Sequence, residues 1–158
     1  MVNEFFIHEV WYSYLNIVMR NILIVGTGTI GEPLIGLLAQ HRKELGLDNI
    51  SFFKRTPLSD EKGKVEALIR KGAKLVATSE AKNDFESMGF KVEDLETSYE
   101  ENQVIIDCTP SGNKNWDEIY SNLDKDKRFL AQGSEHGFGP FFAWGINNNV
   151  LANDQNKY

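Results

Sequence analysis

The sequence predicts an α/β fold, with a doubly wound, mostly parallel sheet that carries helices on both of its faces. Short runs rich in aliphatic residues, such as residues 21–25 and 103–108, are typical of parallel strands that are buried on both sides. These runs alternate with segments whose apolar residues recur at helical spacing, and that alternation indicates βαβ units. Because such crossovers are right-handed, we expect ligands at the carboxyl ends of the strands.

The elements follow one another along the chain in this alternating order. The first strand, residues 21–25, leads through a glycine-rich turn into a helix at residues 30–42, where Leu34, Leu37 and Leu38 recur at helical spacing. Residues 94–101 are polar and are expected to form a connection. The remaining strands are expected at residues 49–54, 74–77, 90–92, 103–108 and 129–131, and the remaining helices at residues 62–71, 82–88 and 116–123.

Length and composition are those of one soluble globular domain. The chain has 158 residues, of which 41% are hydrophobic and 25% are charged. Its net charge of −6 argues against a nucleic-acid partner, and no apolar run is long enough to span a bilayer, so no membrane partner is expected. A single cysteine cannot form an internal disulfide, and a reducing cytoplasmic location is the simplest setting.

The motif that carries most information is Gly26-Thr27-Gly28-Thr29-Ile30-Gly31, which follows the first strand and opens the first helix. This order of strand, glycine turn and helix is the context that a dinucleotide-binding fingerprint requires. Gly26 permits the tight turn, Gly28 lets the backbone approach a pyrophosphate, and Gly31 lets the helix pack against the strand. The N–H groups at the helix start then face the phosphates. We therefore expect a Rossmann-like domain with a cofactor site at residues 26–31.

The end of the second strand indicates which dinucleotide the site accepts. An NAD-preferring site usually places an acidic residue there, about 20 residues after the glycines, to hold the ribose 2′-hydroxyl. This sequence instead has Lys54, Arg55 and Thr56, with no acidic residue before Asp60. These cations would pair with a 2′-phosphate through charge-assisted hydrogen bonds, whereas the alternative is a solvated basic turn. The expected cofactor is NADP or NAD, with NADP favoured.

Two later strand ends supply further candidate groups. Thr109, Pro110 and Gly112 follow the strand at residues 103–108 and are expected beside the nicotinamide ribose. Gln132 and Gly133 follow the last strand and lie at the neighbouring strand end. All five are therefore assigned to cofactor binding.

The cysteine and the histidines are given structural or solvent-exposed positions. Cys108 lies where strand packing is expected and has no histidine near it in the sequence, so we expect a buried structural thiol. His136 is expected to be a solvated loop residue. One cysteine and three scattered histidines have no metal-ligand spacing, and no metal site is expected.

Residues 1–18 precede the first strand and are expected to be an N-terminal extension, with translation starting at Met19. Their aromatic residues allow an alternative, a partner-binding helix, and the sequence does not decide between the two. Residues 19–158 are expected to form one NAD(P)-binding Rossmann domain, without a catalytic domain.

With these segments in view, the chain resembles the N-terminal half of the archaeal-type glyceraldehyde-3-phosphate dehydrogenases. The order and spacing of the matching segments both fit that family, and the segments span most of residues 20–158. They are Gly28-Thr29-Ile30-Gly31, Lys54-Arg55-Thr56-Pro57, Asp107-Cys108-Thr109-Pro110-Ser111-Gly112 and Gln132-Gly133-Ser134-Glu135. Ser134 is a departure, because the family turn usually reads Gln-Gly-Gly-Glu.

The resemblance implies the cofactor-binding part of a phosphorylating aldehyde dehydrogenase. In that family the nucleophilic cysteine begins a second domain, and no residue up to Tyr158 matches it, so no catalytic residue is assigned. The complete enzyme is expected to oxidise a phosphorylated aldehyde, to pass hydride to NAD(P) and to form a homo-oligomer.

Two alternatives are left open. One is another Rossmann reductase, similar to dihydrodipicolinate reductase or homoserine dehydrogenase, and the other is a stand-alone dinucleotide-sensing module. A half-enzyme is expected to expose an apolar face around Phe138, Phe141, Phe142 and Trp144, and a self-sufficient module is not.

Overall fold

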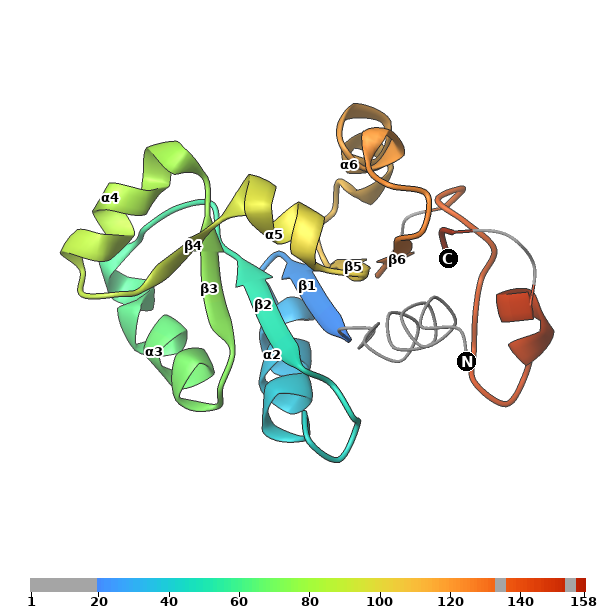
Figure 1. The fold of residues 1–158 in the computed structure, drawn as a ribbon, viewed down its shortest axis with the longest axis horizontal. Coiled ribbons are helices and arrows are strands. Elements are labelled where there is room, and N and C mark those ends of the chain that lie inside the picture. Colours follow the sequence, from blue (N-terminus) through green and yellow to red (C-terminus); the bar gives the residue numbers. More distant parts are fainter. Residues whose placement is uncertain (1–19, 133–135, 153–155) are drawn as a thin grey trace, which may run out of the picture.

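A single parallel sheet forms the centre of the protein. The structure is a computed structural model, and it describes residues 20–132, 136–152 and 156–158. Six strands pair in the order β4-β3-β2-β1-β5-β6, and every pairing is parallel (Figure 1). The strands are β1 (Asn21–Val25), β2 (Asn49–Phe53), β3 (Lys74–Ala77), β4 (Val92–Asp94), β5 (Val104–Asp107) and β6 (Arg128–Ala131).

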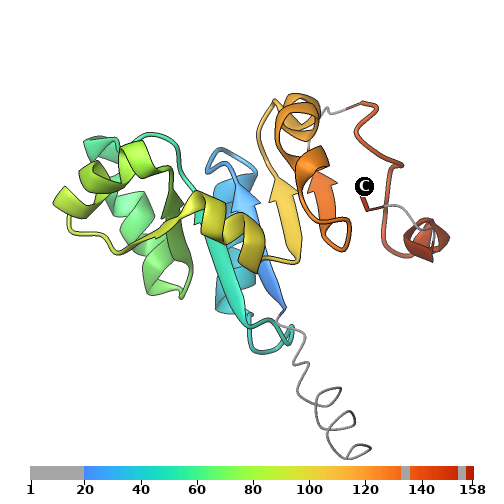
Figure 2. The same ribbon diagram turned by 45° about the horizontal axis from the view of Figure 1, so that its top comes forward.

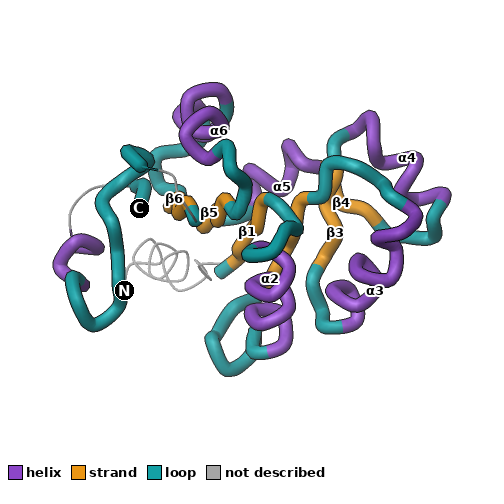
Figure 3. The backbone as a smooth tube through the Cα atoms, turned by 180° about the vertical axis from the view of Figure 1, so that it is seen from behind, coloured by secondary structure: helices purple, strands orange, loops and turns teal. Residues whose placement is uncertain are grey.

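Helices cover both faces of this sheet, which confirms the predicted Rossmann-like, doubly wound α/β fold. The α-helices are α2 (Gly31–Gln40), α3 (Lys62–Arg70), α4 (Ser79–Ser87), α5 (Leu95–Glu101) and α6 (Gly112–Glu118). The first three pack on one face, while α5 and α6 pack on the other (Figures 2 and 3). Short 3₁₀ turns occupy Ser59–Glu61, Tyr120–Asn122 and Asn148–Ala152.

The sheet divides the core into two layers, and the side chains of the central strand β1 contribute to both of them. Ile22 and Ile24 of β1 face α2, whereas Leu23 and Val25 face the α5 side. Successive side chains of a strand point to opposite faces, so a strand that is covered on both sides must be apolar throughout. This is why β1 has five buried residues in a row.

Residues 95–101 correct the sequence prediction, because they form helix α5 and not a polar connection. The Asp94 carboxylate accepts a hydrogen bond from the backbone N–H of Thr97 at 3.1 Å and so caps the first turn. Leu95 and Tyr99, four residues apart, are buried against the sheet. The acidic residues of the segment, Glu96, Glu100 and Glu101, are exposed, and their number made the segment look like a linker.

Other boundaries differ from the prediction mainly at helix ends. The helix expected at residues 116–123 begins at Gly112 and ends at Glu118, after which Tyr120–Asn122 continues as a 3₁₀ turn. Helix α4 begins at Ser79 and not at residue 82, and β4 starts at Val92. The remaining strands and helices lie close to their expected bounds.

The segment after β6 returns to the edge of the sheet. The backbone N–H of Phe129 donates to the Asn156 carbonyl at 2.7 Å, and the Tyr158 N–H donates to the Phe129 carbonyl at 2.8 Å. Gly139 is tightly enclosed there, because a Cβ at this position would lie 2.5 Å from the carbonyl oxygen of Lys157. Residues 156–158 therefore extend the sheet beyond β6.

The apolar face expected after β6 exists only in part. Phe138 is 2% exposed and packs edge-on against Trp116, with ring centroids 5.9 Å apart, because it completes the core on the α5 side. Its exposure was predicted wrongly. Phe141 and Trp144, in contrast, are 72% and 80% exposed.

Two findings bear on partners. Within the described ranges, no helix combines the length and apolar character needed to cross a membrane. The same ranges contain no group of three or more acidic, histidine or cysteine side chains placed to hold a metal ion. The predicted extension, residues 1–18, lies outside the described residues.

Candidate functional site

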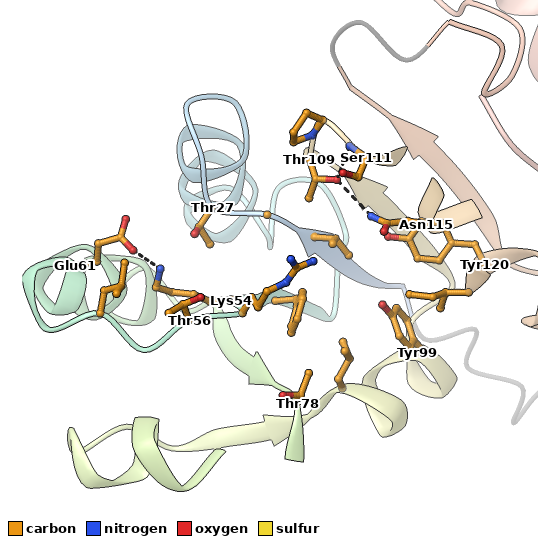
Figure 4. Close-up of a pocket in the computed structure, with 18 residues that line it drawn as sticks. Thr27, Lys54, Thr56, Glu61, Thr78, Tyr99, Thr109, Ser111, Asn115 and Tyr120 are labelled. Atoms are coloured by element: carbon orange, nitrogen blue, oxygen red, sulfur yellow. Dashed lines mark hydrogen bonds and ion pairs between the residues drawn. The ribbon is translucent and has the colours of Figure 1, made fainter. Parts of the chain in front are cut away.

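The strand order places a crevice between the carboxyl ends of β1 and β5. The chain builds β1 to β4 outward in one direction, then crosses through α5 and returns to pair β5 with the free edge of β1. At such a switch point the loops after the two central strands leave in opposite directions and open a space between them. A pocket of about 600 Å³ occupies this position, and it is lined by residues that follow β1, β2, β3 and β5 (Figure 4).

Two of the three glycines in the turn after β1 are required by packing. Gly26 has a φ of +99°, in the left-handed region that side chains disfavour. A Cβ on Gly31 would lie 2.0 Å from the carbonyl oxygen of Gly26, because the first turn of α2 sits directly on the loop. The roles predicted for these two glycines are therefore present in the structure.

Gly28 has no such structural reason. A Cβ at Gly28 would meet no atom within 4 Å, and its φ lies outside the left-handed region. The residue faces open space at the amino end of α2, and Ile30, the residue that caps this helix, makes no side-chain hydrogen bond to it. This end of the ten-residue helix therefore combines backbone N–H groups, the positive end of the helix dipole and room for a ligand.

The basic cluster after β2 is divided between a paired cation and an exposed one. Lys54 is 6% exposed, and its ammonium forms an ion pair with Glu61 (Figure 4). The hydrogen bond from Lys54, supported by a second ion pair to Lys64 at 3.3 Å, lowers the pKa of Glu61. Arg55 and Thr56 are exposed and line the pocket. The charge of Lys54 is thus already compensated, whereas that of Arg55 faces the pocket.

A buried carboxylate organises the loop after β5. Asp107 is 0% exposed and accepts hydrogen bonds from the Thr109 hydroxyl at 2.6 Å, the Asn115 amide at 2.7 Å and the Tyr120 hydroxyl at 2.8 Å. A buried charge requires such partners, because burial without them is costly. This network fixes the Thr109 loop beside the pocket and connects it to α6.

Cys108 has the properties of a structural thiol. It is partly buried, and burial together with the neighbouring Asp107 carboxylate raises the pKa of its thiol to about 11. The thiolate is the nucleophilic form, so a raised pKa keeps Cys108 unreactive at neutral pH. The expectation of a structural thiol agrees with this environment.

The pocket brings together about half of the residues assigned from the sequence. Those that line it are Gly26, Thr27, Lys54, Arg55, Thr56, Thr109 and Pro110. Those that do not line it are Gly28, Thr29, Ile30, Gly31, Gly112 and Gln132. The backbone N–H of Gln132 instead donates to the Asp107 carbonyl at 2.8 Å. Gly133 lies outside the described residues.

Sequence reasoning missed several residues that line the pocket. They are Leu58, Glu61, Thr78, Leu95, Tyr99, Asn115, Ile119 and Tyr120. Leu95 and Tyr99 could have been found from their spacing of four residues, which places both on one face of a helix. Asn115, Ile119 and Tyr120 depend on how α6 packs against the sheet, whereas Leu58, Glu61 and Thr78 lie in the connections that follow β2 and β3.

Comparison with known proteins finds no matching family model and no matching curated protein. Among solved structures, the chain is similar to an imine reductase from Pseudomonas sp., with 18% identity and a TM-score of 0.44 over 72% of this chain and 32% of that one. It is also similar to a cobalt- and zinc-bound alcohol dehydrogenase from Pyrobaculum aerophilum, with 14% identity and a TM-score of 0.43. That match covers 84% of this chain and 32% of the dehydrogenase. A shikimate dehydrogenase from Aquifex aeolicus has 22% identity and a TM-score of 0.35. That match covers 63% of this chain and 41% of the dehydrogenase.

The chain spans only about a third of the length of the first two of these proteins. The fold assignment therefore rests on the strand order and the placement of the helices.

Proposed function

We propose that this pocket binds an NAD(P) dinucleotide and that the chain is the cofactor-binding part of an oxidoreductase. The observation that carries the proposal is the glycine turn at the switch point. Its outer glycines are explained by packing, while a Cβ on Gly28 would meet no protein atom within 4 Å. A glycine without a structural reason, at the amino end of a helix, fits the close approach of a diphosphate.

The remaining residues fit the other parts of such a cofactor. The exposed Arg55 and Thr56 suit the adenosine ribose and its 2′-phosphate, and Glu61, an acidic residue that lines the pocket, is compensated by Lys54. This arrangement favours NADP over NAD. Thr109 and Pro110 lie at the end of β5, on the side expected for the nicotinamide ribose. When bound, the nicotinamide ring would supply the carbon that accepts hydride.

We further propose, from the sequence resemblance, that the complete enzyme is a phosphorylating glyceraldehyde-3-phosphate dehydrogenase that acts as a homo-oligomer. Cys108 does not supply its nucleophile, because this thiol is held protonated beside a buried carboxylate. Another Rossmann reductase would use the same pocket equally well. Reading the encoding DNA beyond Tyr158 for a family-like cysteine segment separates these two possibilities.

Gly28→Ala tests the cofactor proposal directly. The variant adds one methyl group where the folded protein has room, so we expect an unchanged melting temperature and a Kd for NADP raised by about tenfold. Gly63→Ala is the matched control, because a Cβ at Gly63 also meets nothing within 4 Å and Gly63 lies in helix α3, outside the glycine turn. Isothermal titration calorimetry with NADP, NADPH and NAD provides the measurement. If the unaltered protein binds none of the three, the proposal is wrong.

A further inference from the structure

The part of the pocket that lies against α5 and α6 differs from the part beside the glycine turn. It is lined by Val25, Leu95, Tyr99, Ile119 and Tyr120, and we call it the aromatic lobe. All five side chains belong to the core layer on the α5 side or pack against it. An apolar surface with aromatic rings is suited to a flat, uncharged ring and unsuited to phosphate.

One hydroxyl in the aromatic lobe has no protein partner. Tyr99 is 4% exposed, yet its hydroxyl donates to no acceptor within residues 20–132, 136–152 and 156–158. In Figure 4 this hydroxyl points toward the middle of the pocket. In the described ranges the buried side-chain polar atom without a partner is Asn102 Oδ1, so the Tyr99 hydroxyl is not sealed from solvent and is reached from the pocket. A ligand with an acceptor at this place would replace water as the partner of this hydroxyl.

The two neighbouring polar side chains are already engaged. The Asn115 amide and the Tyr120 hydroxyl both donate to Asp107, at 2.7 and 2.8 Å. Tyr99 is therefore the hydroxyl of the lobe that is free to bind a ligand. Burial raises the pKa of Tyr99, with smaller contributions from Glu96 and Asp107, so the group stays protonated and remains a donor at neutral pH.

The position of the aromatic lobe indicates which end of a dinucleotide it would meet. The same pocket contains Arg55 and Thr56, which suit the adenosine ribose, but it does not include Gln132 on the β6 side. Adenine is uncharged at neutral pH and has ring nitrogens that accept hydrogen bonds, whereas oxidised nicotinamide carries a positive charge.

We propose that the aromatic lobe receives the adenine base and that the Tyr99 hydroxyl donates a hydrogen bond to one of its ring nitrogens. Tyr99 is thus a specificity-determining residue for the base. The inference rests on the proposed function, since it assigns one end of the same cofactor.

Tyr99→Phe removes the hydroxyl and nothing else. Titration calorimetry should use two ligands, NADP and adenosine 2′,5′-bisphosphate, which has the adenine end without nicotinamide. We expect Tyr99→Phe to raise the Kd of both ligands by the same factor, about three- to tenfold, because one hydrogen bond to the shared base is lost. The melting temperature of the free protein should not fall, because this hydroxyl has no partner in the described structure.

Tyr120→Phe is the contrasting variant, because it removes a hydrogen bond to the buried Asp107 carboxylate and should lower the melting temperature. Two results of the titration would overturn the inference while the proposed function stands. A loss of affinity for NADP alone would place Tyr99 at the nicotinamide end, and no loss of affinity for either ligand would exclude Tyr99 from recognition of the cofactor. If the unaltered protein binds neither ligand, the proposed function itself fails.

Discussion

The glycine turn after β1 contains residues that are constrained for different reasons. Gly31 is fixed by the fold, since a methyl group there would collide with the Gly26 carbonyl in the absence of any ligand. Gly28 is free of such contacts and is explained by the ligand that we propose. The motif in the sequence cannot separate these two reasons, because spacing alone does not show which atoms come close.

The basic residues after β2 show the same limit of sequence reasoning. Lys54 and Arg55 are equivalent in the sequence, yet the structure pairs Lys54 with Glu61 and leaves Arg55 exposed. That pairing depends on the 3₁₀ turn Ser59–Glu61, which returns Glu61 to the pocket. A side chain seven residues away in a short irregular turn has no periodicity from which it could be predicted.

Arg55→Gln should therefore change the preference between the two coenzymes. Without the guanidinium, a 2′-phosphate loses its charge-assisted partner, so we expect the Kd of NADP to rise about tenfold while that of NAD changes by less than about twofold. Arg70→Gln is the matched control, because Arg70 is an exposed residue at the end of α3 that does not line the pocket. Equal weakening of NADP and NAD would contradict the assignment of Arg55 to the 2′-phosphate.

Among the elements, the buried strands were the easiest to predict, and α5 was the hardest. A strand such as β1 is covered on both faces and shows five buried residues in succession, which is a strong signal. Helix α5 has only seven residues and buries a narrow face through Leu95, Ser98 and Tyr99. The exposed acidic residues of α5 masked this narrow apolar face in the sequence. The aromatic lobe of the pocket, which α5 helps to form, was therefore not predicted either.

The capping of α5 gives a dependence on pH that can be measured. Hydrogen bonding to the Thr97 N–H lowers the pKa of the Asp94 carboxyl from its ordinary value of 3.8. The charged form is therefore favoured in the folded state, and its contribution to stability is present above pH 3.8 and is lost as the pH falls through the lowered pKa. We expect the melting temperature to fall in that acid range.

Asp94→Asn and Asp94→Ala separate the cap from the charge. Asparagine caps helices about as well as aspartate, so Asp94→Asn should keep most of the melting temperature at pH 7 and weaken its decline below pH 4. Asp94→Ala should lower the melting temperature already at pH 7. Thermal unfolding followed by circular dichroism between pH 2.5 and 7 is the measurement, and identical pH profiles for the unaltered protein and Asp94→Asn would contradict the role of this carboxylate.

At the scale of the whole molecule, the sheet has a protected edge beyond β6. Residues 156–158 bind the backbone of Phe129 and Ala131, and the Lys157 ammonium lies 4.3 Å from the centre of the Trp116 ring. An unprotected edge strand presents unpaired N–H and C=O groups that can pair with another chain. The returning segment therefore limits association at this edge.

Gly139→Ala should displace that segment. The added Cβ would lie 2.5 Å from the Lys157 carbonyl oxygen, so the backbone of residues 156–158 must move away from β6. We expect a lower melting temperature and a larger apparent mass by light scattering at high protein concentration. The Gly63→Ala variant should neither raise the apparent mass nor lower the melting temperature, because alanine is favoured over glycine inside helix α3. A Gly139→Ala protein that melts and scatters light like the unaltered one would contradict this description of the edge.

The central place of β1 also has a consequence for the newly made chain. One edge of β1 pairs with β2, which follows closely in the sequence, but the other edge pairs with β5, whose residues begin only at Val104. During synthesis the first four strands can therefore assemble on the ribosome while the edge of β1 that later pairs with β5 still has no partner. Until Val104–Asp107 emerges from the exit tunnel, the unpaired edge of β1 can form non-native pairings with other strands. We therefore expect the nascent protein to need protection by chaperones most during this interval.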